Sequence, residues 1–512
     1  MMPVLTVSQM RAIDEQAILS NISVGYSYMM KAGMELFSVA HQMVNDRKTG
    51  DIAILCGKGN NGGDGYVAGR LLLEAGYGVM CFGLCEGEEL ENEAKKAYDE
   101  YIEKSGNFCH LDDIELLENI HTYALIIDAM LGTGIKGNPR AFYADVIRKI
   151  NQSGVRILAV DTPSGLNNDT GIPSSPCINA TATVTMGFPK IGAYFYPGKS
   201  SVGTLFIKEL GYPEKIVAAN HDNIFIPEFG DLKGALPPRK PDGSKFDHGC
   251  AMMVCGSKGM TGSATLACLA AIRTGCGMVH CATPHSALPV LSSKLTETVM
   301  HSIDETSRGT PSYNALSQLL DLAEKNDSIC IGPGISHDNE TTQLVKEFVK
   351  KAGKPMILDA DGINAFKGAA EHLKEINAEI ILTPHKGEWA RLFGSLPEQP
   401  LEIIASLKQK ASEYNCTILL KGNPTLVADP QANIYILPYG NSGMATAGSG
   451  DVLSGIIASL LAQGCKTTDA AILGAFIQGI AGDFAREKRG EYSMIAGDLI
   501  DSIYKVMNIL TE

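Results

Sequence analysis

Short apolar segments alternate with stretches of helical periodicity along most of this 512-residue chain. Several of these segments run directly into glycine-rich or polar turns, as strands of a parallel sheet do before the helix that follows. Such sheets are covered by helices on both faces. We therefore expect an α/β fold whose first part is a three-layer, Rossmann-like domain. The strands predicted there are residues 51–56, 78–84, 123–128, 155–161 and 181–186.

The second part of the chain shows the same alternation over a longer stretch. Residues 211–247 are rich in proline and weakly periodic, which favours a connection between domains. A chain of 512 residues also exceeds what one core usually organises. We expect two domains, residues 1–215 and 225–512. In the second, the predicted strands are 251–255, 278–282, 328–331, 355–359, 380–383 and 417–420, and the helices include 262–274, 449–462, 469–486 and 495–510.

The overall charge and the cysteine content narrow the class of protein. The formal net charge of −14 argues against nucleic-acid binding and against binding to anionic membranes, because both rely on basic surfaces. The 13 cysteines follow no paired metal-binding spacing and fit reduced thiols. No apolar run approaches the roughly 18 residues of a membrane span, and the start of the chain does not resemble a signal peptide. We expect a cytoplasmic homo-oligomer without nucleic-acid or membrane partners.

The run Gly448-Ser449-Gly450-Asp451 precedes an apolar stretch at residues 452–461, within the helix predicted at 449–462. Its glycines allow backbone N–H groups to converge on a phosphate, and the helix offers the positive end of its dipole. Asp451 can then take a proton from a hydroxyl group. This combination indicates phosphoryl transfer to an alcohol, whereas the run alone fits a glycine-rich helix cap equally well.

In the first domain, polar residues follow three predicted strands, where open α/β sheets bind their ligands. The amides of residues 60–65 can hold a phosphate, although this segment is not the dinucleotide fingerprint G-x-G-x-x-G. Oxygen atoms of Asn61, Asp128 and Ser164 can encircle a hard cation such as potassium, which leaves Asp161 free for acid–base work. Each of these four residues, taken alone, would be expected simply in a turn. Because all of them follow strands of one sheet, together they predict a ligand-binding site.

The motifs N60-N-G-G-D-G65, D128-A-M-L-G-T-G-I-K-G137 and D161-T-P-S-G165 resemble those of the NAD(P)H-hydrate epimerases of the YjeF N-terminal type. The resemblance covers roughly residues 1 to 215. It implies that Asp161 and Lys190 carry protons during epimerisation. We expect the dinucleotide to contact Asp161 and two segments: Asn60, Asn61, Gly62, Gly63 and Asp64, and Gly132, Thr133, Gly134, Ile135, Lys136, Gly137 and Asn138.

In the second domain, residues 256–266 follow a strand and open a helix, which suits close approach of a ligand to the backbone. Four more polar segments follow other predicted strands. They supply carboxylates, an imidazole and a lysine, and we expect all of them at one edge of the sheet, as walls of a nucleotide and substrate pocket. These segments are residues 332–334, 359–364, 383–388 and 421–425.

The order G256-S-K-G, G332-P-G, D359-A-D-G-I-N364, T383-P-H-K-G-E-W-A-R-L392, K421-G-N-P-T and A447-G-S-G-D451 resembles the ADP/ATP-dependent NAD(P)H-hydrate dehydratases of the ribokinase-like superfamily. The resemblance spans about residues 225 to 512. It implies that Asp451 is the base and that magnesium accompanies ADP or ATP. Contacts to the hydrated dinucleotide are implied for Ala264, Gly334, His385 and Asp451, and contacts to the adenine nucleotide for Lys421, Gly422, Asn423, Pro424, Thr425 and Gly450.

Taken together, these motifs predict a bifunctional enzyme of nicotinamide nucleotide repair. The first domain would interconvert the R and S forms of hydrated NADH or NADPH, and the second would restore the cofactor from the S form with ADP or ATP. Two alternatives remain open. One is a vitamin or sugar kinase with a fused small-molecule domain, which would release a stable phosphorylated product. The other is a first domain that only senses a nucleotide.

Overall fold

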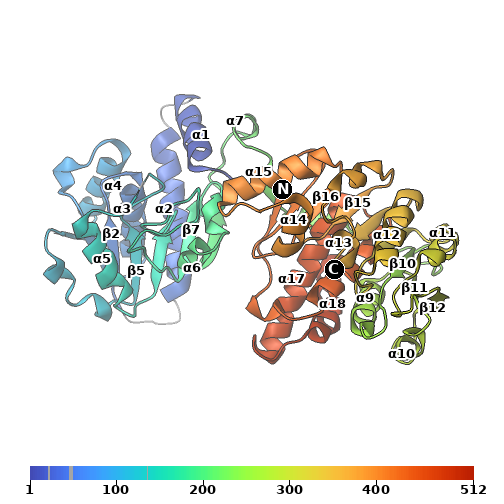
Figure 1. The fold of residues 1–512 in the computed structure, drawn as a ribbon. Coiled ribbons are helices and arrows are strands. Elements are labelled where there is room, and N and C mark those ends of the chain that lie inside the picture. The colour runs from blue at the N-terminus through green and yellow to red at the C-terminus, as the bar shows by residue number, and fades with distance from the viewer. Residues whose placement is uncertain (21–23, 45–49, 135–136) are drawn as a thin grey trace. The chain divides into compact units, whose positions relative to one another are not determined.

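The computed structural model describes residues 1–20, 24–44, 50–134 and 137–512 (Figure 1). These residues form two compact units. The N-terminal unit comprises Pro3–Asp222 with Gln399–Leu401. The C-terminal unit comprises Asn223–Glu398 and Glu402–Glu512 with Met1–Met2.

The N-terminal unit is built on a seven-stranded sheet among the described residues, in the order β4-β3-β2-β5-β6-β7-β8. All of its strand pairs are parallel. The strand order reverses between β2 and β5, and such a switch point leaves a crevice at the carboxyl ends of the strands. The strands are β2 (Ile52–Cys56), β3 (Val79–Gly83), β4 (Asn107–His110), β5 (Leu125–Ala129), β6 (Ile157–Val160), β7 (Ala182–Met186) and β8 (Thr204–Lys208).

Helices cover both faces of this sheet. On one face, apolar side chains of α2 and α3 pack against Ile54, Ile127 and Leu158. On the other, α5 packs against Ala53, Ile126 and Ala159. The expected three-layer α/β domain is therefore confirmed. Its helices are α1 (Val7–Ser20), α2 (Val24–Val44), α3 (Asn60–Glu74), α4 (Asn92–Glu103), α5 (Ala141–Asn151), α6 (Gly198–Val202) and α7 (Glu214–Ala219), with 3-10 turns η1 (Gly87–Glu89), η2 (Ile114–Leu117), η3 (Ile120–Thr122) and η4 (Ile191–Ala193).

The C-terminal unit contains an eleven-stranded sheet in the order β1-β9-β18-β17-β16-β15-β14-β13-β10-β11-β12. The strands from β16 to β12 in this order are parallel, and β17 runs antiparallel to both of its neighbours. The strands are β1 (Met2–Pro3), β9 (Ile224–Ile226), β10 (Cys250–Val254), β11 (Met278–Pro284), β12 (Val299–Ile303), β13 (Ser328–Ile331), β14 (Met356–Leu358), β15 (Ile380–Leu382), β16 (Thr417–Leu420), β17 (Thr425–Ala428) and β18 (Ile434–Leu437).

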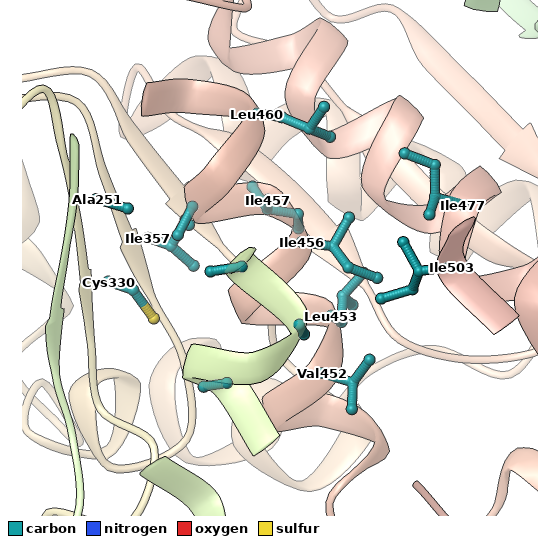
Figure 2. Close-up of a cluster of buried hydrophobic side chains, with 14 of the residues drawn as sticks. Ala251, Cys330, Ile357, Val452, Leu453, Ile456, Ile457, Leu460, Ile477 and Ile503 are labelled. Atoms are coloured by element: carbon teal, nitrogen blue, oxygen red, sulfur yellow. The ribbon is translucent and has the colours of Figure 1, made fainter. Parts of the chain in front are cut away.

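The core of this unit lies between the sheet and four long helices (Figure 2). Helix α16 (Ser449–Ala462) is buried from Val452 onward and packs between the sheet and helices α9 (Thr261–Thr274), α17 (Thr467–Arg489) and α18 (Ala496–Thr511). This burial fixes the start of α16 at the sheet edge. The remaining helices are α8 (Phe229–Ala235), α10 (Leu288–Ser292), α11 (Leu316–Ala323), α12 (Asn339–Lys351), α13 (Asp361–Asn364), α14 (Lys386–Phe393) and α15 (Pro400–Glu413), with η5 (Tyr313–Ala315), η6 (Ala370–Glu375) and η7 (Ser442–Met444).

Two segments differ from the expectation. The glycine-rich residues 60–64 are the first turns of α3 and not a loop before it. Glycine is required there by close packing, since a Cβ at Gly62 would lie 2.0 Å from the carbonyl oxygen of Gly57. The proline-rich residues 211–247 are not a plain connection. They contain α7, α8 and β9. Strand β9 pairs in parallel with β18, and its side chains Ile224 and Ile226 are buried.

Candidate active sites

A cavity of about 610 Å³ opens in the N-terminal unit, at the carboxyl ends of β2, β5, β6 and β7. The sequence-predicted residues that line it are Asn60, Asn61, Asp64, Gly132, Thr133, Gly134, Asp161 and Lys190. Gly62 and Gly63 are buried against neighbouring backbone and side chains and do not line it. Gly137 and Asn138 also lie outside this lining, and Ile135 and Lys136 fall outside the described residues.

Asp161 and Lys190 form an ion pair at this cavity. The Nζ atom of Lys190 lies 2.5 Å from Oδ1 of Asp161, and only 2% of the lysine side chain is exposed. Nζ also donates to the hydroxyl of Thr185, and the backbone N–H of Met186 donates to Asp161. Asp161 has a φ of 62°, an unfavourable conformation for a residue with a side chain. The ammonium and carboxylate are thus held together beside the cavity.

Two further residues of this cavity were not predicted from the sequence. The phenol of Tyr212 donates a 2.5 Å hydrogen bond to Asp14, and burial raises the pKa of Asp14. Burial also raises the pKa of Asp64, to which the charges of Asp161 and Asp14 contribute. The carboxyl groups of Asp14, Asp64, Glu93 and Asp161 therefore share this cavity with the basic side chains of Arg11, Lys58 and Lys190. Nothing in the local sequence around Asp14 or Tyr212 indicates this, because both reach the cavity through tertiary packing.

The predicted cation ligands Asp128 and Ser164 are brought together below the cavity. Asp128 is fully buried at the end of β5 and accepts hydrogen bonds from the hydroxyl of Ser164 at 2.6 Å and from its backbone N–H at 2.8 Å. Burial raises the pKa of Asp128 to about 6. No ion pair involves Asp128 among the described residues. Asn61 has a buried Nδ2 atom without a hydrogen-bond partner in the described part of the chain.

Asp451 lies in the first turn of α16 in the C-terminal unit. Gly448 caps this helix with a φ of 93°. The N–H of Ser449 donates to the carbonyl of Thr446 at 3.4 Å, whereas those of Gly450 and Asp451 lie at the helix start without an intrahelical acceptor. Burial, followed by the charge of Asp359, raises the pKa of Asp451 to about 6, and a hydrogen bond from Ser263 limits this rise. A helix start and a carboxyl with a raised pKa therefore meet here.

Asp359, Lys421 and Glu388 form a charged network next to this turn. The Nζ atom of Lys421 donates a 2.8 Å hydrogen bond to Asp359 and lies 3.5 Å from Glu388. Asp359 also accepts hydrogen bonds from the hydroxyls of Thr383 and Ser454, both at 2.8 Å. A Cβ at Gly450 would lie 3.4 Å from Nζ of Lys421. The ammonium group of Lys421 therefore lies beside the helix start.

The other predicted residues of this unit lie on several elements. His385 caps α14, where its Nδ1 accepts the N–H of Gly387 at 2.9 Å while half of its side chain stays exposed. Gly334 has a φ of 68°, and a Cβ there would lie 3.0 Å from the carbonyl oxygen of Met260. Ala264 is fully buried near the start of α9.

The segment from Lys421 to Thr425 forms the turn between β16 and β17. Thr425 is the first residue of β17. The peptide bond between Asn423 and Pro424 is cis, and the hydroxyl of Thr425 donates to the carbonyl of Gly422 at 3.1 Å. This turn therefore carries Lys421 at one end and Thr425 at the other.

Comparison with known proteins assigns a family to each unit. Residues 251–505 match the family described as NAD(P)H-hydrate dehydratase, and residues 25–192 match the family described as YjeF-related protein N-terminus. The combination defines a two-domain protein of nicotinamide nucleotide metabolism.

Relatives that match the whole chain carry the same two-part name. The "Bifunctional NAD(P)H-hydrate repair enzyme Nnr" of Moorella thermoacetica is 40% identical over 100% of this chain and 98% of its own. Those of Thermofilum pendens and Escherichia coli are 34% and 32% identical over 100% and 94% of this chain and 97% and 90% of their own. The chain belongs to the family of bifunctional NAD(P)H-hydrate repair enzymes, as the motifs predicted.

A solved structure is also similar to part of the chain. The ADP/ATP-dependent NAD(P)H-hydrate dehydratase from Bacillus subtilis, co-crystallized with ATP/Mg2+, is 27% identical with a TM-score of 0.49, and covers 56% of this chain and 99% of its own. Within the described residues, no helix is both long and apolar enough to cross a membrane.

Proposed function

We propose that this chain repairs hydrated NADH and NADPH in two steps. The N-terminal unit interconverts the R and S epimers, and the C-terminal unit converts the S form into NADH or NADPH while it consumes ADP or ATP. The observation that carries the proposal is Asp451, a carboxyl with a raised pKa in the first turn of a glycine-capped helix. A base and a phosphate cradle at one place suit phosphorylation of a hydroxyl group.

In the N-terminal unit, epimerisation requires a proton to be removed and returned near the hydroxylated ring carbon. Asp161 and Lys190 share a short contact, so a proton can pass between Oδ1 and Nζ without movement of either side chain. The backbone N–H of Met186 and the hydroxyl of Thr185 orient the carboxylate. Asp161 therefore serves as the proton carrier, and Lys190 as its partner.

Potassium suits the pair formed by Asp128 and Ser164, with Asn61 as a further oxygen ligand in this proposal. A fully buried carboxylate without a paired cation costs free energy, and an ion with oxygen ligands removes that cost. The raised pKa of Asp128 reflects the same unfavourable burial. When bound, the cation supplies positive charge below the cavity, while the chain holds the carboxylate through the two Ser164 hydrogen bonds.

In the C-terminal unit, Asp451 takes the proton of the substrate hydroxyl as its oxygen attacks the terminal phosphorus of the nucleotide. The N–H groups at the start of α16 hold the transferred phosphoryl group. Phosphate then leaves the ring, and the double bond of the reduced nicotinamide is restored. Lys421 and the turn to Thr425 face the nucleotide in this proposal, with His385, Gly334 and Ala264 toward the dinucleotide.

Magnesium accompanies the nucleotide and neutralises charge on its phosphates. The carboxylates that act on Asp451 are Asp359 and Asp361. Both accept hydrogen bonds within the chain, Asp359 from Lys421 and Asp361 from the backbone N–H of Ser336. The side chain of Asp361 is 13% exposed and that of Asp359 only 2%, so the more accessible Asp361 fits better as a ligand. Oxygen donors of this kind match the preference of magnesium.

One experiment tests both steps. Hydrated NADH, as a mixture of epimers, is incubated with the protein, magnesium and either ADP or ATP, and the absorbance of the reduced ring is followed. Complete recovery of NADH supports the proposal. Recovery of only the S fraction contradicts the epimerase step, and a stable phosphorylated product without NADH favours the kinase alternative. We further propose a homo-oligomer, which light scattering during gel filtration tests.

A further inference from the structure

Three cysteines from three different elements converge in the core of the C-terminal unit. Cys255 directly follows β10, Cys268 lies on α9 and Cys281 lies on β11. Their sulfur atoms all lie within 4.8 Å of one another, and those of Cys255 and Cys281 are 3.9 Å apart. All three side chains are 0% exposed. A buried cysteine usually acts as a small apolar side chain, but here three thiols face one point.

The sulfur atoms have the spacing of a metal centre. With metal–sulfur bonds of about 2.3 Å, three sulfurs around one ion lie about 4 Å apart. The separation between Cys255 and Cys281 is already at this value. Cysteine binds metals as the thiolate, so an ion at this point displaces the thiol protons.

A disulfide between Cys255 and Cys281 fits less well than a shared ion. Cys281 pairs in register with Met253, and the backbone ladder continues from Cys255 to Ala282. Cys255 is two residues beyond the partner of Cys281, which places their Cα atoms roughly 8 Å apart on adjacent strands. Disulfides rarely span more than about 7 Å. An ion between the sulfurs needs no such approach of the backbones.

The number of ligands favours monovalent copper over zinc. Soft thiolates select Cu(I), zinc or iron–sulfur clusters, and structural zinc is almost always four-coordinate. Among the described residues, no fourth histidine, cysteine or carboxylate joins the group. His301 lies on the adjacent strand β12, but it pairs with Ala282, one residue along β11 from Cys281, so its side chain points to the opposite face of the sheet.

We propose that Cys255, Cys268 and Cys281 bind one Cu(I) ion and that its binding inhibits the C-terminal unit. Binding releases the thiol protons of its ligands and leaves copper in its monovalent state. The proposal that copper inhibits the C-terminal unit rests on the proposed function of Asp451. The proposal that the three cysteines bind copper does not depend on that function.

The cluster is linked to the proposed dehydratase site through two of its cysteines. Cys255 precedes Gly256, whose N–H donates to the carbonyl of Pro333 at 2.8 Å. Cys268 lies on α9, whose first turns carry Ser263, a hydrogen-bond partner of Asp451. Copper that draws the sulfurs together shifts α9 against β10. The contact between Ser263 and Asp451 changes with it.

Reduced full-length protein is incubated without oxygen with Cu(I) held by a coloured chelator, over hours because the thiols are buried. We expect transfer of one copper per chain, seen as loss of chelator colour and as one added copper in native mass spectrometry. We expect dehydration to fall at least tenfold and epimerisation to stay unchanged. Cys268→Ala should abolish both the transfer and the inhibition while it keeps the copper-free activity.

Cys330→Ala is the matched control, because Cys330 is equally buried on β13 of the same sheet (Figure 2). It should bind copper like the wild type. If Cys268→Ala fails to fold by circular dichroism, Cys268→Ser replaces it. Copper transfer that persists without Cys268, or one-to-one binding of Zn(II) without Cu(I), overturns the site. Copper binding with full dehydration overturns the inhibitory role, and lack of dehydration in copper-free protein contradicts the proposed function instead.

Discussion

Lys190 is almost fully buried and its Nζ atom lies 2.5 Å from Oδ1 of Asp161, on the wall of the N-terminal cavity. A buried lysine is rare unless it is paired, because desolvation of its charge is costly. The second partner, the hydroxyl of Thr185, also accepts from Nζ. Lys190 and Asp161 are therefore shielded from solvent, as suits a proton-transfer site. Each residue of the pair can be tested by its own substitution.

Replacement of Asp161 by Ala should leave the S epimer fully processed and stall the R epimer. Asp161 and Asp451 belong to different compact units, so changes at one should be independent of the other. In a mixed sample, turnover should proceed quickly through the S fraction and then slow to the spontaneous epimerisation rate. Consumption of the whole mixture at the wild-type rate would show that Asp161 is structural.

Replacement of Lys190 by Gln should lower epimerisation by ~10²–10⁴-fold, the range for loss of a group that transfers protons. Dehydration of the pure S form should not change. Lys208→Gln is the matched control, since Lys208 of the same unit pairs with Glu35 near the surface at 2.8 Å. Equal losses in both variants would point to a loss of charge in general and not to proton transfer by Lys190.

Potassium should stabilise the N-terminal unit in a pH-dependent manner. The pKa of Asp128 is raised to about 6 in the folded state, so its ionised form destabilises the fold at higher pH. Bound potassium offsets this cost only when the carboxylate is ionised. The rise in melting temperature on exchange of choline for potassium should be larger at pH 8 than at pH 5, and it should vanish in Asp128→Asn. An equal rise at both pH values excludes this site.

Much of the fold follows from the sequence, because strands buried on both faces leave continuous apolar runs. β2 and β13 and helix α16 lie close to their predicted bounds for this reason. β9 has only three residues, too few to give a periodic signal, and it forms because β18 offers it a partner. Short strands that depend on a neighbour are visible only in the structure.

In the candidate sites, too, some features could be predicted from the sequence and others depend on tertiary packing. The motifs predict that Asp161 and Asp451 lie at sheet edges, since both follow strands or precede helices. They do not predict that Lys190 is buried, because a lysine after a proline is usually solvated. Lys421 was predicted as a nucleotide contact, and its pairing with Asp359 and Glu388 arises from residues 62 and 33 positions away in the chain. Such contacts depend on tertiary packing.

Replacement of Lys421 by Met should destabilise the C-terminal unit as well as weaken nucleotide binding. Its removal leaves Asp359 buried without a paired cation, which costs about 3–5 kcal/mol for such pairs. Thr425→Ala loses only the hydrogen bond to Gly422 and separates the two effects. We expect it to raise the nucleotide requirement with little change in melting temperature. An equal rise in the requirement for hydrated dinucleotide would contradict the assignment of this turn.

Asp451→Asn should abolish dehydration and retain nucleotide binding, because it removes the base but not the N–H groups of α16. The pKa of Asp451 is about 6, so kcat/KM of the wild type should fall about tenfold per pH unit below that value. The raised pKa also means that the ionised carboxylate destabilises the fold, so the variant should melt higher than the wild type at pH 8 but not at pH 4. Asp501→Asn, on the exposed face of α18, should change neither property. More than roughly a tenth of wild-type dehydration in Asp451→Asn, a loss of less than ~1.4 kcal/mol in transition-state stabilisation, would exclude Asp451 as the base.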